Sequence, residues 1–135
     1  MTRLFLTLPL VAALAAPAAA TPAMPIEKEP VITAQLTSAM VGDIIRKTCP
    51  TISARLLVAF GKAQDLKDYA LKQGYSEAEI KGFLKNKAEK ERIRKAARVY
   101  LEAKGAKPGD AEAHCAVGRA EIAARTLTGQ MLSGG

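Results

Sequence analysis

The side chains with the most distinctive chemistry are two cysteines, Cys49 and Cys115, and a single histidine, His114. Covalent haem attachment requires a C-x-x-C-H motif, whereas here one cysteine follows the histidine. A zinc ion needs three or four protein ligands, and these three residues supply them only if both thiols are free. A nucleophilic serine, threonine or cysteine needs a neighbouring base, and the only histidine adjoins a cysteine that we expect to be oxidised. We therefore predict no cofactor, no metal site and no enzymatic activity.

The start of the chain has the order of a secretory signal peptide. Arg3 precedes an apolar stretch over residues 4–16, and small residues follow it. Ala18 and Ala20 match the small-x-small pattern that a signal peptidase cleaves. We predict a signal peptide over residues 1–20 and a periplasmic or secreted mature protein; a buried or anchoring helix is the alternative.

Export changes the interpretation of the two cysteines, because disulfides persist outside the cytosol. We predict one bridge between Cys49 and Cys115, with free thiols or a bond to a partner as alternatives. Closing a loop of this length stabilises a fold by about 4 kcal/mol in the chain-entropy model.

The mature chain is predicted to consist of a proline-rich arm over residues 21–32 and one helical domain over residues 33–135. Prolines at 22, 25 and 30 disfavour helix in the arm. Apolar periodicity and capping residues predict helices from Thr33 to Cys49, from a Thr51 or Ser53 cap to Gly74, from a Ser76 cap through Leu84, from Lys87 to Gly105, and over 111–131.

Each predicted helix has an apolar face for a common core. In the second helix this face includes Leu56, Phe60, Leu66 and Ala70. The sequence contains no alternating strand pattern and no hairpin signal. We therefore predict an all-α fold, a compact bundle of four or five helices stapled by one disulfide.

Positive charge is concentrated in residues 81–107, which carry ten basic and three acidic side chains, a net charge of +7. Such a segment suits anionic lipid head groups or an acidic protein surface. Its aromatic residues are Phe83 and Tyr100 alone, which is too few for base stacking, so nucleic acid is not the predicted partner. The residues predicted to contact an anionic partner are Lys85, Arg92, Arg94, Lys95 and Arg98.

The alternative for this segment is an ordinary solvated helix face. Glu91 with Lys95, and Arg98 with Glu102, have the i, i+4 spacing of weak surface ion pairs. Such pairs stabilise a helix by about 0.2–0.5 kcal/mol each.

Two further arginines, Arg55 and Arg119, lie in apolar or small-residue stretches. Structural ion pairs are the default expectation for both. We expect these arginines to form ion pairs with acids such as Glu121 or Asp43.

Three blocks resemble a family of small exported proteins from the Rhodobacter group that contain a domain of unknown function. The blocks are Ser53-Ala54-Arg55, Gly74-Tyr75-Ser76-Glu77-Ala78-Glu79-Ile80 and Cys115-Ala116-Val117-Gly118-Arg119-Ala120-Glu121-Ile122. The resemblance covers most of the mature chain and carries no catalytic residues. It implies an association with membrane-attached respiratory complex I.

These observations favour a non-catalytic exported interaction protein, an accessory factor of a membrane-attached, respiratory complex. Its contact surface is expected on the basic helix or on the small-residue last helix around Gly118 and Ala124. The alternatives are a cationic protein that binds anionic envelope or membrane surfaces and, third, an unrecognised enzyme.

Overall fold

The computed structural model describes residue 18 and residues 20–135, so most of the expected signal peptide lies outside the described residues. Helices dominate the described part, and Cys49 is bonded to Cys115, which confirms the all-α bundle with one disulfide. The elements are η1 (Ile26–Lys28), α1 (Pro30–Thr48), β1 (Ile52–Ala54), α2 (Leu56–Lys72), α3 (Glu77–Lys85), α4 (Lys87–Ala103), α5 (Ala111–Ala124), α6 (Leu127–Gln130) and β2 (Leu132–Gly134). Across the described residues, no helix is long and apolar enough to cross a membrane.

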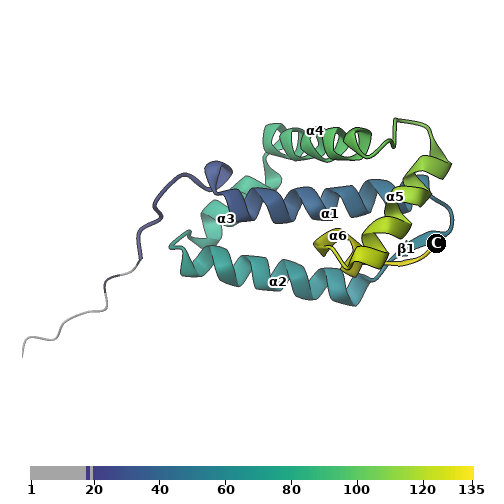
Figure 1. Ribbon diagram of the computed structural model, residues 1–135. Helices are drawn as coiled ribbons and strands as arrows, with labels where there is room; N and C mark the ends of the chain where they lie inside the picture. Colours follow the sequence, from purple (N-terminus) through teal and green to yellow (C-terminus); the bar gives the residue numbers. More distant parts are fainter. Residues whose placement is uncertain (1–17, 19) are drawn as a thin grey trace, which may run out of the picture.

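Helix α1 lies between α4 and α2, with α3 near its N-terminal end, α6 beside its middle and α5 near its C-terminal end (Figure 1). The larger core cluster joins α1 to α4 and to the disulfide; it includes Val41, Ile45, Ala97, Leu101 and Cys115. A smaller cluster joins the start of α1 to α2 and α3; it consists of Ile32, Ala70, Tyr75, Ile80 and Phe83. The α4 side chains in this core, Ala97 and Leu101, lie on the apolar face predicted for this helix.

The disulfide connects the C-cap of α1 to the first turns of α5, as predicted. Gly118 lies one turn beyond Cys115 and is buried. A Cβ atom at Gly118 would lie 2.4 Å from Ile52 and 2.8 Å from Ile45. The small residue therefore permits close packing of α5 on the core, and the expectation that Gly118 belongs to a free contact surface is wrong. Ala124 is exposed.

Helix α1 begins at Pro30, and the prediction of a Thr33 cap is wrong. Glu29 is the N-cap, and its carboxylate accepts a hydrogen bond from the backbone N–H of Ile32 at 2.6 Å. Pro30 occupies a first-turn position, where its missing N–H costs no helical hydrogen bond. The Tyr69 hydroxyl donates to the same carboxylate at 3.0 Å, which ties the start of α1 to α2.

The predicted capping box at the start of α3 is confirmed. The Ser76 hydroxyl accepts from the Glu79 N–H at 3.1 Å, and the Glu79 carboxylate accepts from the Ser76 N–H at 2.7 Å. These hydrogen bonds lower the pKa of Glu79, because they stabilise its charged form.

We expect Ser76→Ala to lower the free energy of unfolding by about 1 kcal/mol, since the variant loses the N-cap acceptor of α3. Urea denaturation followed by circular dichroism measures this change. The control is Ser133→Ala, an exposed position in β2, which should change stability by less than about 0.5 kcal/mol. Equal stability of the two variants would contradict the assigned cap.

The prediction of one continuous helix over 111–131 is wrong beyond Ala124. Helix α5 ends at Ala124, Arg125 adopts a left-handed conformation with φ 52°, and a Thr126 cap starts α6. The chain then forms β2, which pairs antiparallel with β1. The two short strands were not predicted, and β1 occupies positions expected to start the second helix.

Candidate functional site

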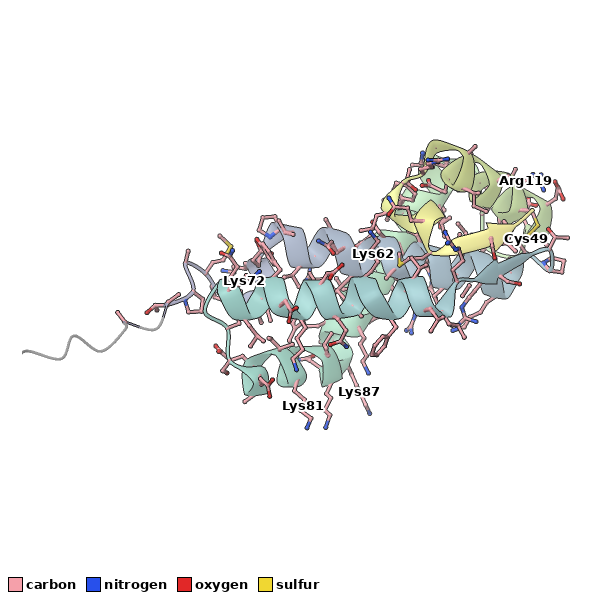
Figure 2. All side chains as sticks on the ribbon, turned by 90° about the horizontal axis from the view of Figure 1, so that it is seen from below. Cys49, Lys62, Lys72, Lys81, Lys87 and Arg119 are labelled. Carbon is pink, nitrogen blue, oxygen red and sulfur yellow. A yellow bond between two sulfur atoms is a disulfide. The ribbon has the colours of Figure 1, made fainter. Side chains whose placement is uncertain are left out.

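The predicted anion-binding residues lie at the end of α3, for Lys85, and along α4, for Arg92, Arg94, Lys95 and Arg98. A helix turns by about 100° per residue, so the four α4 side chains spread over roughly 160° around its axis. They therefore do not form one compact patch. Figure 2 shows Lys81 and Lys87, two other basic residues of this segment, on one side of the molecule and Cys49 and Arg119 toward the other end.

Acidic neighbours neutralise part of this segment. Arg92 pairs with Glu89 at 2.8 Å, and Arg94 pairs with Glu91 at 2.7 Å. Arg98 lies 3.9 Å from the other oxygen of Glu91. The three arginines and Glu91 are substantially exposed to solvent and Glu89 is half-buried, so each pair contributes little to stability.

The two expected i, i+4 pairs of α4 are not formed. Glu91 pairs instead with Arg94 and Arg98, which flank it on the side opposite to Lys95 around the helix axis. Lys85 and Lys95 have no ion-pair partner in the part of the chain that the structure describes.

The prediction that Arg55 and Arg119 form internal ion pairs with Glu121 or Asp43 is also wrong. Arg55 donates to the carbonyl of Gln130 at 3.2 Å, which fixes the entry to α2 against the C-terminal segment. Arg119 pairs with Glu112 at 2.8 Å. Glu112 lies about two turns earlier on the exposed side of α5.

Glu121 belongs to a buried polar cluster that the sequence interpretation missed. Its carboxylate accepts hydrogen bonds from the hydroxyls of Tyr100 and Thr126, and the Lys104 ammonium lies 3.6 Å away. Burial, together with the Glu121 hydrogen bond and charge, raises the pKa of Tyr100. Because both carboxylate oxygens have donors, this cluster is a structural anchor between α4, α5 and α6.

His114 is buried, and its Nδ1 lies 2.6 Å from the carbonyl oxygen of Asp110. The ring is therefore held within its own helical turn. Among the described residues, no group of three metal-ligating side chains comes together.

The most unusual surface feature lies in the first half of α2. Leu56, Leu57 and Phe60 are 74%, 90% and 65% exposed. The predicted apolar face of this helix is thus buried only toward its C-terminal end, where Leu66 and Ala70 join the smaller core cluster. Single exposed leucines are ordinary, but three large apolar side chains within five positions form a patch that is typical of interaction sites. We call Leu56, Leu57 and Phe60 the α2 patch.

The sequence profile of a protein family described as "Family of unknown function (DUF5333)" matches residues 24–133, which include all the helices of the described chain. No curated protein and no solved structure matches the chain.

Proposed function

We propose that this chain, which belongs to the DUF5333 family, is a non-catalytic exported helical interaction protein that acts as an accessory factor of a membrane-attached, respiratory complex. The single observation that carries the proposal is the α2 patch. The family itself is one of unknown function and adds no activity.

The α2 patch supports docking because its exposure is unfavourable in the free protein. Burying a leucine or phenylalanine side chain fully is worth about 1.5–3 kcal/mol. A partner that covers Leu56, Leu57 and Phe60 therefore gains several kcal/mol of apolar burial, less the cost of association. The helix keeps its fold without this contribution, since Leu66 and Ala70 anchor it from the other end.

Export is the second part of the proposal. It is supported by the basic, apolar and small-residue order of the first 20 residues and by the Ala18-x-Ala20 pattern. The buried Cys49–Cys115 disulfide is compatible with an oxidising compartment.

Co-purification in a mild detergent tests the interaction. The tagged full chain, expressed in its own cell type, should copurify with a defined membrane protein, and the double variant Leu57→Gln, Phe60→Gln should lose that protein. Val99→Gln is the matched control, because Val99 is an exposed apolar residue on α4, outside the α2 patch. No specific protein with the wild type, or equal loss with the control, would contradict the proposal.

A second candidate function is binding to an anionic membrane surface. The observations that favour it are the net charge of +7 in residues 81–107 and the absence of ion pairs at Lys85 and Lys95 within the described residues. Attraction of this kind weakens with ionic strength, because the Debye length falls from about 10 Å at 0.1 M salt to 3 Å at 1 M.

Charge reversal separates the two candidates. If the basic segment binds lipid, the variant Lys85→Glu, Arg94→Glu, Arg98→Glu should lose binding to anionic phospholipid vesicles by at least about tenfold. The wild type should bind these vesicles less at high salt and should not bind zwitterionic vesicles. Vesicle binding that is unchanged in a folded variant would leave the basic segment as a solvated helix face.

A further inference from the structure

Three apolar hollows adjoin one another along α1. The first, of about 260 Å³, lies between α1, α3 and α4; the second, of about 120 Å³, between α1, α2 and α3; the third, of about 230 Å³, between α1, α2 and the C-terminal segment. Leu36, Phe83 and Leu84 line both of the first two, and Ala39 and Asp43 line both the first and the third. The shared residues place the hollows side by side along α1, and we call the three hollows together the trough.

The floor of this trough is a stripe of α1. Leu36, Ala39, Met40 and Asp43 recur at i, i+3, i+4 and i+7, so they share one face and the trough runs along the helix axis. Helix α4 forms one wall and α2 the other, as expected from the position of α1 between them (Figure 1). Helix α3 closes one end.

The trough is open to solvent at its first and third hollows, whereas the second lies among buried residues of the smaller core cluster. Ala39 on the floor is exposed, Leu84 is 48% exposed, and Leu56 of the α2 patch lies on the wall. A small apolar ligand or a single acyl chain is normally enclosed on most sides, which this shape does not provide. An occupant with one apolar and one polar side suits an open trough.

The hydrogen-bonding state of the backbone around the trough indicates which kind of protein segment can bind there. The floor and both walls are helices, whose backbone groups are already bonded along their own axes. Among the lining residues, Ala54 of β1 and Leu132 of β2 are paired with each other, so a protein segment in the trough must satisfy its own backbone groups. An amphipathic helix does this, and it is a common occupant of apolar grooves.

At one end of the floor, Asp43 is neutralised by two cations. Burial alone would raise the pKa of Asp43, but hydrogen bonds and charge from Lys47 and Arg46 outweigh it and lower the pKa. The Lys47 ammonium lies 2.6 Å from one carboxylate oxygen, and Arg46 bonds the other. This group of three side chains therefore has a net positive charge.

The α4 wall of the trough also has an excess of positive charge. Glu89 on the wall pairs with Arg92, whereas Lys90 has no ion-pair partner in the described chain. The wall belongs to residues 81–107, which carry the net charge of +7. The rim of the trough is therefore complementary to acidic side chains.

We propose that this trough binds an amphipathic helix of a partner protein, with its apolar side on Leu36, Ala39 and Met40 and acidic side chains facing Lys90 and Arg46. The inference rests on the proposed interaction function and specifies the site and the chemistry of the partner. Along the floor, Leu36 and Arg46 are separated by ten rises of 1.5 Å, about 15 Å, which corresponds to about three turns of a docked helix.

A designed peptide tests the site directly. The probe is a fluorescent helix-forming peptide of about 18 residues with leucines at i, i+3, i+4 and i+7, a few glutamates beside this apolar stripe and alanines at the other positions. Fluorescence anisotropy should show binding that Ala39→Trp, which fills the floor, weakens at least about tenfold. Ala120→Trp, at an exposed position on α5, should bind as the wild type does.

A second peptide tests whether binding requires acidic side chains on the partner helix. A peptide with lysine in place of every glutamate should bind at least about tenfold more weakly than the acidic peptide. Lys90→Glu should weaken the acidic peptide and strengthen the basic one, a reversal that a loss of folding cannot produce. Binding that Ala39→Trp leaves unchanged, or no preference for the acidic peptide, would overturn the proposal.

The same variant distinguishes this inference from the proposed function. If Ala39→Trp still copurifies with the membrane protein that Leu57→Gln, Phe60→Gln loses, the trough is not the docking site but the interaction function stands. If the wild type captures no membrane protein, the proposed function itself fails, whatever the designed peptide does.

Discussion

Replacing Cys115 by serine is expected to lower the free energy of unfolding by about 2–5 kcal/mol. The bridge closes a loop across a sequence separation of 66 residues, so its loss enlarges the conformational freedom of the unfolded chain. It also leaves the Cys49 thiol buried in the larger core cluster. Urea denaturation of the purified protein under non-reducing conditions measures the difference.

Reduction provides the control for this variant. A reducing agent should destabilise the wild type by a similar amount and should leave the double variant Cys49→Ser, Cys115→Ser unchanged. A loss below about 1 kcal/mol would show that packing, rather than the covalent link, holds α5 against α1.

Gly129→Ala is expected to destabilise the fold by about 3 kcal/mol, the upper part of the usual range for overpacking. A Cβ atom at Gly129 would lie 1.9 Å from the backbone oxygen of Glu121 and 2.7 Å from the backbone nitrogen of Ile122. Backbone atoms of α5 cannot rotate away, so α6 must shift. That shift would disturb the hydrogen bond from the Thr128 hydroxyl to the carbonyl of Ser38, which ties α6 to α1.

The matched substitution is Gly82→Ala, because Gly82 lies within α3 and a Cβ atom there would meet nothing within 4 Å. It should stabilise the protein by about 0.5–1 kcal/mol through improved helix propensity. Thermal and urea unfolding of both variants give the comparison. Similar stabilities for the two alanine variants would rule out close packing of α6 on α5.

Local signals in the sequence were sufficient for several features. The Ser76 cap and the helix end at Gly105 depend on residues close in the chain, and each is observed. The stripe of Ile93, Ala97 and Leu101 is buried, because its opposite face is strongly charged and leaves one orientation for α4. The disulfide was predictable from the presence of two cysteines in a chain whose first residues have the order expected of an export signal.

Features that depend on contacts distant in the chain were not predictable. Helical periodicity assigned Leu56, Phe60, Leu66 and Ala70 to one buried face, but α3 covers only the last two. The end of α5 depends on Glu121, which bonds to Tyr100 on α4 as well as to Thr126. The helix propensity of residues 111–131 favours one continuous helix, because propensity depends on local sequence and not on these tertiary hydrogen bonds.

The candidate site was only partly predictable for the same reason. Composition located the basic segment but did not indicate that Glu91 would pair with Arg94 and Arg98 rather than Lys95. The α2 patch and the trough emerge only when the helices are assembled, because exposure is a property of the fold and not of the periodic pattern.

Site-specific photocross-linking in living cells tests the central claim, docking through the α2 patch, most directly. A photoreactive phenylalanine analogue is placed at Leu57 in one variant and at Val99, the exposed apolar control on α4, in another. The account predicts one discrete covalent adduct with a membrane protein from position 57 and none from position 99. No adduct at position 57, or the same adducts from both positions, would contradict it.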